Sequence, residues 1–167
     1  HSEKPEHQAL GCKLLRKLAK ENNYSLVLPL LQSPHAIVRN EAIRTAEHIQ
    51  HPKLHQELFR LFDQEPQVPE LLQALAAYGD QNIREIDARL SEKIPHLARD
   101  RQLASLLAAI KTPAALELLF SQLTHPIAEV RGYAIQLLYQ SQFTIPPSLE
   151  KDFDVYVEQW LRDAYHL

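Results

Sequence analysis

Three histidines fall close together in the first third of the chain: His48, His51 and His55. Imidazole nitrogens beside a carboxylate such as Glu47 are ligands that zinc accepts. However, Pro52 interrupts any helix between the first and the last of these histidines, so their rings do not share one helix face. The pattern therefore favours histidines in exposed turns, and we expect no metal and no other cofactor.

A basic strip near the start of the chain is the next candidate, formed by Lys13, Arg16, Lys17 and Lys20. The spacing i, i+3, i+4, i+7 places all four on one side of a helix. Such a strip could meet nucleic-acid phosphates or an anionic membrane surface. The net charge of −3 argues against general polyanion binding, which favours a solvated helix face and leaves nucleic-acid binding as the weaker alternative.

The sequence lacks the usual signatures of a catalytic centre. It contains no Gly-rich phosphate loop, no nucleophile elbow and no cysteine pair. We therefore predict that the chain is not an enzyme. The single Cys12 excludes an internal disulfide and favours a reducing, cytoplasmic location.

An aromatic stripe marks the last stretch of the chain: Phe153, Tyr156, Val157, Trp160 and Leu161. These positions share one helix face. We expect the stripe to seal the end of the core, with docking of a neighbouring domain or of a second copy as the alternative. Acidic residues around Trp160 argue against DNA binding there.

Proline turns organise the elements that must position these residues. The chain of 167 residues holds 11 Pro and only three Gly, and 45% of it is apolar, which indicates helices separated by proline turns. We expect a first helix over 4–20, with Leu10, Leu14 and Leu18 as its apolar stripe. The other expected helices cover 24–32 (bent at Pro29), 35–50, 53–63, 69–78, 81–94, 97–110, 113–123, 127–141 and 148–165.

One turn phrase occurs twice, 92 residues apart. Leu31, Pro34, Val38, Arg39, Ala42 and Ile43 match Leu123, Pro126, Val130, Arg131, Ala134 and Ile135. Between them, steps of about 30 residues place the anchor at Val68 and at Ala98, where the pattern is looser. The arginines at Arg39, Arg99 and Arg131 are expected to pair with turn acids or helix C-terminal carbonyls.

This phrase, Leu-x-x-Pro-x-x-x-Val-Arg-x-x-Ala, resembles the short, phycobilisome-lyase-like form of the HEAT repeat family. The resemblance implies an all-α right-handed superhelix, an α-α solenoid of about ten helices in antiparallel pairs. It implies one domain over 1–167, with an N-terminal cap helix at 4–21, about four helix-pair repeats at 22–141 and a C-terminal cap helix at 146–167.

The second helix of each pair in such repeats lines a concave side that usually binds partners. The exposed positions expected there are Asn40, Arg44, Glu47, Gln73, Gln102 and Gln136. We therefore predict a non-catalytic scaffold that binds an unidentified protein partner or another domain of its parent chain. Because the sequence starts at His1 and contains no Met, the alternative is a regulatory cytosolic domain of a larger enzyme or membrane transporter, and membrane contact is expected only through such a parent.

Overall fold

The computed structural model describes residues 4–18 and 20–165, and over these residues it contains ten α-helices, four short 3-10 helices and no strand. The all-helical class predicted from the sequence is therefore confirmed. The chain divides into two compact units, His1–Gly79 and Asp80–Leu167. None of the described helices is long and apolar enough to cross a membrane. Residues 1–3 of the predicted domain, Ala19 of the predicted N-terminal cap and residues 166–167 of the predicted C-terminal cap lie outside the described residues.

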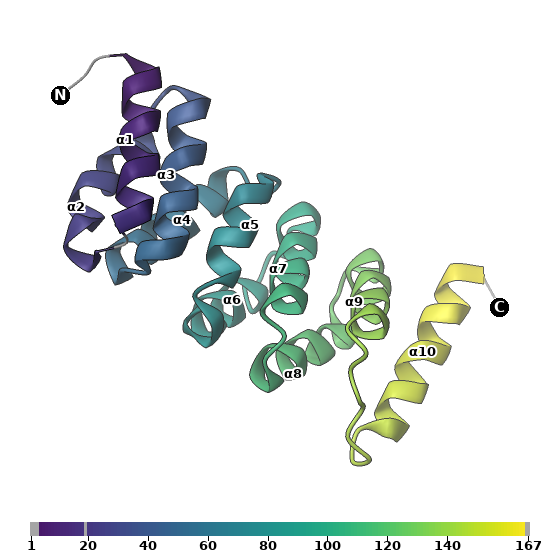
Figure 1. Ribbon diagram of the computed structural model, residues 1–167. Helices are drawn as coiled ribbons and strands as arrows, with labels where there is room; N and C mark the ends of the chain where they lie inside the picture. The colour runs from purple at the N-terminus through teal and green to yellow at the C-terminus, as the bar shows by residue number, and fades with distance from the viewer. Residues whose placement is uncertain (1–3, 19, 166–167) are drawn as a thin grey trace. The chain divides into compact units, whose positions relative to one another are not determined.

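The first unit is built from five α-helices, and their order is visible in Figure 1. They are α1 (Pro5–Leu18), α2 (Tyr24–Val27), α3 (Ala36–Ile49), α4 (Pro52–Gln64) and α5 (Pro69–Ala76). The predicted helix over 24–32 is bent at Pro29, as expected, into α2 and the 3-10 turn η2 (Leu28–Gln32). A further 3-10 turn, η1 (Glu21–Asn23), precedes α2.

Helix α3 is the centre of the first unit, because it packs against α1 before it and α5 after it. Small residues at the contact, Ala42 and Ala46, are fully buried and let the helix axes approach closely. On the other side of the unit, α4 packs against α2 and η2. The fully buried Leu54, Leu58 and Phe62 of α4 fill the space between these layers.

In the second unit, as in the first, each helix packs against the next helix but one. Its helices are α6 (Ile83–Leu90), α7 (Leu97–Ile110), α8 (Pro113–Ser121), α9 (Ala128–Gln140) and α10 (Glu150–Tyr165), with 3-10 turns η3 (Gly79–Asn82) and η4 (Gln122–Thr124). Helix α7 packs against α9, and α6 packs against α8. Helix α6 ends at Leu90, four residues before the predicted end. The N-cap of α6 is Asn82, and the Asp80 carboxylate accepts a hydrogen bond from the Thr112 hydroxyl.

The repeated turn phrase has the same geometry in both copies. Arg39 Nη1 donates to the carbonyl oxygens of Ser33 and Pro34, at 2.9 and 3.2 Å. Arg131 Nη1 donates to those of His125 and Pro126, at 2.8 and 3.3 Å. Each guanidinium therefore satisfies carbonyl groups that a helix end leaves unpaired. The structural role expected of these arginines is confirmed.

The residue before each proline also has the same role, although its identity differs. Ser33 Oγ accepts the backbone N–H of His35 at 3.3 Å, and His125 Nδ1 accepts that of Ile127 at 3.1 Å. Ser33 therefore orders the turn and is not the N-cap of α3, which is His35. The repeat thus conserves a hydrogen-bond acceptor at this point of the turn in two chemical forms.

The middle repeats keep the pattern in a register that differs by one residue from the predicted one. In α5 the buried residues are Leu71, Ala74 and Leu75, which match Ala42, Thr45 and Ala46 at an offset of 29. In α7 the buried residues include Leu103, Leu106 and Leu107, at an offset of 61, and His96 repeats the N-cap position of His35. The predicted anchors Val68 and Ala98 are only half-buried, and the observed offsets place the equivalents of Val38 at Gln67 and Arg99, so the buried anchor is not repeated there.

The apolar stripe predicted for α1 is wrong. Leu10, Leu14 and Leu18 are exposed, whereas Ala9 and Cys12 are buried against α3. The reason is close packing, because small side chains on α1 let the backbone of α3 approach. Thr45 Oγ1 donates to the Cys12 carbonyl oxygen at 3.0 Å across that contact.

Candidate functional site

The second unit contains an open apolar groove. It has a volume of about 990 Å³ and lies between α9, the segment that follows it and α10. Ile135, Leu138 and Tyr139 of α9 form one wall, and Phe143 and Ile145 of the connection form its end. Phe153, Val157 and Trp160 of α10 form the other wall.

Gly132 sets how closely α10 approaches α9. A Cβ atom placed at Gly132 would collide with the indole Nε1 of Trp160 and would lie 3.1 Å from its Cε2. Glycine at this helical position therefore makes room for the indole ring, although glycine is a poor helix former. Trp160, the only tryptophan of the chain, is thereby held in the groove wall.

Helix α10 covers the end of the second unit only in part. Phe120, which is buried, packs against the rings of Phe153 and Tyr156 with centroids 6.2 and 6.3 Å apart. No residue of α10 is itself buried, and Tyr139 on the facing helix is 86% exposed. The aromatic stripe thus anchors α10 to the core along one edge and leaves the other edge open as a groove.

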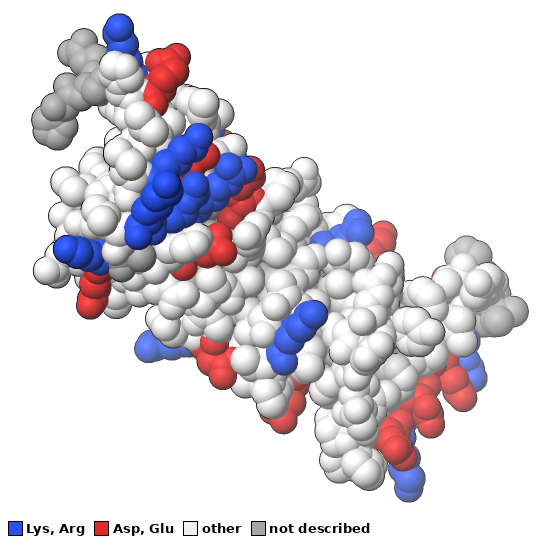
Figure 2. Space-filling view, viewed as in Figure 1, with Lys and Arg blue, Asp and Glu red and all other residues white. Residues whose placement is uncertain are grey.

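The charges around the groove are acidic. Helix α10 carries five acidic residues against two basic ones, and Figure 2 shows acidic atoms along this helix. One of them, Asp163, accepts a hydrogen bond of 2.7 Å from Arg131 Nη2. That bond, followed by one from Gln159, lowers the pKa of the exposed Asp163 carboxyl. Arg131 therefore ties the repeat turn to α10.

The two predicted contact residues of the second unit, Gln102 and Gln136, have different surroundings. Gln136 is exposed and lines the groove, whereas Gln102 is half-buried on α7. In the observed register the α7 position equivalent to Arg44 is Ser105, whose hydroxyl lies 2.8 Å from the Tyr133 hydroxyl. The sequence did not reveal the groove itself; the signal that could have found it is Gly132, which replaces Asn40 at the equivalent position of the repeat.

The predicted contact residues of the first unit lie together on α3 and α5. Arg44 forms ion pairs with Glu41 at 3.0 Å and with Glu70 at 3.2 Å. Gln73 Nε2 donates to Glu47 Oε1 at 3.4 Å. Asn40 is half-buried on α3. The structure therefore places these residues on neighbouring helices and engages three of them in contacts between α3 and α5.

Glu41 joins this network to α1. Its carboxylate is almost fully buried and lies 3.3 Å from Arg16 Nη1 as well as 3.0 Å from Arg44 Nη1. Arg16 is therefore turned toward α3 and does not belong to the exposed basic strip predicted on α1.

The thiol of Cys12 lies in the same contact between α1 and α3. Burial, and to a smaller extent the negative charge of Glu41, raises the pKa of this thiol to about 11.

The three clustered histidines have separate roles. His48 is exposed and its Nδ1 lies 2.9 Å from the Arg44 carbonyl oxygen. His51 caps α4 by accepting the Lys53 N–H and stacks on Tyr24 at 3.6 Å. His55 was expected in an exposed turn, but it is buried within α4 and stacks on Tyr78 at 4.7 Å. No group of three or more His, Cys, Asp or Glu residues in the described part of the chain could hold a metal ion.

A buried acid and histidine lie at the core of the second unit. Asp100 accepts hydrogen bonds from the His96 N–H at 2.7 Å and from Arg99 Nε at 3.1 Å. His125 Nε2 lies 3.3 Å from the same carboxylate. His125 Nδ1 accepts the Ile127 N–H, and Nε2 is the ring nitrogen that lies beside Asp100. The pair therefore stabilises the turn and is closed to solvent.

No family model, no curated protein and no solved structure matches this chain.

Proposed function

We propose that this chain is a non-catalytic, HEAT-like repeat scaffold that binds a protein partner in the groove between α9 and α10. The observation that carries the proposal is the groove itself, an open apolar hollow of about 990 Å³. Apolar grooves between helices commonly accept the apolar face of a partner helix. The HEAT-like superhelix is supported by the recurring turn, by the return of buried positions every 29 to 32 residues, and by packing between alternate helices within each unit.

The groove is a better candidate than the polar side of α3. Arg44 and Glu47 already contact α5, so a partner must displace those contacts or accommodate them. Ile135 and Tyr139 have no such engagement and present apolar surface next to an indole ring. Aromatic side chains in a pocket are the typical anchors of protein interfaces.

A photo-reactive amino acid in the groove wall tests the proposal. Placed at Tyr139, it should form a cross-link to a discrete partner, whereas the same group at the exposed Glu117 of α8 should not. An Ile135→Asp change should abolish the Tyr139 cross-link because a carboxylate makes the groove unfavourable for an apolar face. A partner that remains bound to Ile135→Asp and is lost only on reversing the charges of Arg44 and Glu47 would place the site on α3 instead.

A further inference from the structure

Helix α1 presents an unexplained apolar row to solvent. Leu10, Leu14 and Leu18 are 56%, 55% and 59% exposed and follow one another at i, i+4 and i+8. Buried Ala9 and Cys12, on another side of the helix, face α3. Three aligned leucines form a continuous patch, which differs from the single exposed apolar residues that are ordinary on protein surfaces.

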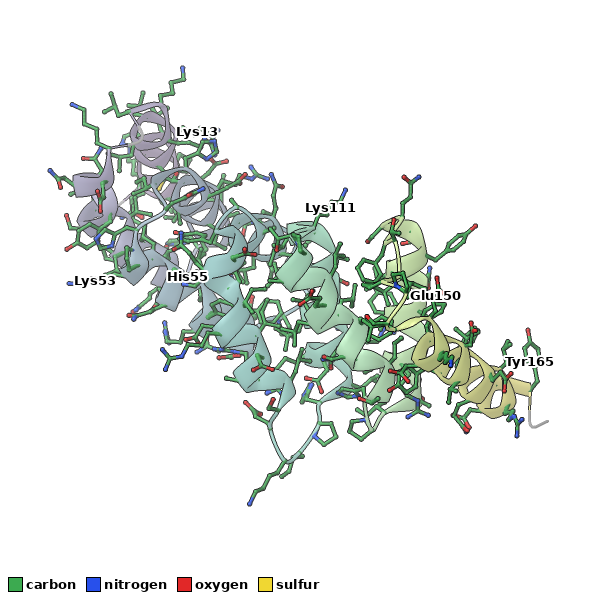
Figure 3. All side chains as sticks on the ribbon, turned by 90° about the horizontal axis from the view of Figure 1, so that it is seen from below. Lys13, Lys53, His55, Lys111, Glu150 and Tyr165 are labelled. Carbon is green, nitrogen blue, oxygen red and sulfur yellow. The ribbon has the colours of Figure 1, made fainter. Side chains whose placement is uncertain are left out.

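A basic row runs beside these leucines. Lys13 and Lys17 are exposed and lie about 60° to 100° around the helix from the neighbouring leucines. Figure 2 shows basic atoms gathered over α1, and Figure 3 labels Lys13 among them. Arg16 is excluded from this row by its contact with Glu41, and Glu6 is the one acidic residue of α1. The exposed side of α1 therefore carries an apolar row and, beside it, a basic row.

The groove of the second unit has the complementary chemistry. Glu150, Asp154 and Glu158 are exposed and form a row that lies next to the groove residues Phe153 and Val157 on α10. Glu150 stands at the start of this row (Figure 3). Glu158 has an exposed partner in Arg162 at 3.9 Å, which is a weak ion pair. An apolar hollow with an acidic edge therefore faces solvent.

From this match we infer that the groove between α9 and α10 of one copy binds α1 of a second copy. The inference rests on the proposed function, since it names the occupant of the same groove. The leucine row lies on the apolar walls, and the row of Lys13 and Lys17 lies along Asp154 and Glu158. Helical geometry places those two charged rows on the same side of the contact when α1 runs parallel to α10.

A second copy fits the observations better than a membrane surface. The lysines lie along one edge of the leucine row only. A groove with acidic residues along one edge can pair with basic residues in that arrangement. The chain as a whole is acidic, with a net charge of −3, which opposes binding to an anionic bilayer. Each copy has one leucine row and one groove, so the contact is head-to-tail and forms rings or chains.

Sedimentation velocity of the full chain at concentrations from the micromolar to the high micromolar range tests the inference. We expect the average mass to rise with concentration and the emission of Trp160 to shift to shorter wavelength as the groove fills. Changing Leu14→Asp should raise the dissociation constant about a hundred-fold, because an exposed leucine becomes a charge at the centre of the contact. A wild-type chain that stays monomeric throughout would overturn the inference.

Charge reversal separates this contact from any other association. Lys13→Glu with Lys17→Glu in one chain, and Asp154→Lys with Glu158→Lys in another, should each weaken self-association about ten-fold. Mixing the two variants should restore association, because each then finds the opposite charge on its partner. Lys53→Glu with Lys93→Glu, on exposed positions away from both surfaces, is the matched control and should change nothing. Failure of the mixture to associate would contradict the proposed contact.

Two further results distinguish this inference from the proposed function. If the chain is monomeric but a partner still cross-links to Tyr139 and is lost on Ile135→Asp, the groove binds a different protein and only the inference is wrong. If the chain remains monomeric and α1 binds vesicles of phosphatidylserine and phosphatidylcholine through its leucines, then α1 binds a membrane surface and the inference is again wrong.

Discussion

Helices α3 and α9 are equivalent elements, 92 residues apart, with the same entry turn and three buried positions in common. Val38 and Val130 are fully buried, and so are Ala42 and Ala134. Their outward sides differ in chemistry. On α3 that side carries Arg44 and Glu47, whereas the equivalent positions of α9 are Gln136 and Tyr139.

The difference shows how two equivalent helices keep the same inward packing while their outward sides differ. The charged side of α3 is engaged by α1 and α5 through Arg16, Glu70 and Gln73. The side of α9 is contacted by α10 through Trp160 and is otherwise open. The inward positions can remain constant because they fix the packing, while the outward positions are free to provide either helix–helix contacts or a groove.

The largest expected effect tests whether the two turns are equivalent. Val38→Asp and Val130→Asp should each lower the free energy of unfolding by about 3 to 5 kcal/mol, because a carboxylate is forced into a fully buried site. Thermal and urea unfolding followed by circular dichroism measure the loss. Glu129→Lys, an exposed neighbour, is the control and should change little. Equal stability of Val130→Asp and Glu129→Lys would disprove the assigned register of α9.

The next prediction compares the two acceptors in the turns. His125→Ala should lower the free energy of unfolding by about 2 to 3 kcal/mol, since it removes the acceptor of the Ile127 N–H and the imidazole ring that lies beside the buried Asp100. Ser33→Ala should cost about 1 kcal/mol, because only the acceptor of the His35 N–H is lost. Urea unfolding of both variants checks the order. A larger loss for Ser33→Ala would contradict the role given to the buried pair.

A smaller effect is expected where the two helices differ in packing. Gly132→Ala should displace Trp160 and shift its emission to longer wavelength, because the new Cβ occupies the space of the indole. The net change in the free energy of unfolding should be small. Alanine favours the helix over glycine by up to about 1 kcal/mol, and this gain offsets the loss of the contact with the indole. Asn40→Ala at the equivalent position of α3 is the control. An unchanged Trp160 emission in Gly132→Ala would show that α10 does not pack as described.

The smallest expected effect concerns pH and the link from Arg131 to α10. The Arg131 hydrogen bond lowers the pKa of Asp163, so the stabilisation it provides is present above the ordinary aspartate pKa and is lost as pH falls through the lowered value. Trp160 emission should therefore be constant near neutral pH and should shift only in acid. Asp163→Asn should remove this transition without unfolding the chain. Persistence of the same acid shift in Asp163→Asn would assign it to another carboxyl.

Much of the fold followed from local features of the sequence. Prolines at 34, 52, 69, 113 and 126 mark the breaks between helices because proline lacks an N–H and fixes its own backbone angle. The predicted range 97–110 agrees with α7, and the turn at Pro34 returns at Pro126 with the same contacts. Such features depend on neighbours in the chain, so the sequence alone determined them.

The faces of the helices were decided by the tertiary structure. Both Leu71 and Leu72 are apolar, yet only Leu71 is buried, because one residue turns a helix by about 100°. On α1 the larger Leu10 and Leu14 point to solvent, and Ala9 and Cys12 face α3. Which face is buried depends on how closely two backbones approach, and this depends on residues far apart in the sequence. The groove has the same origin, since it requires Gly132 and Trp160, 28 residues apart, to meet.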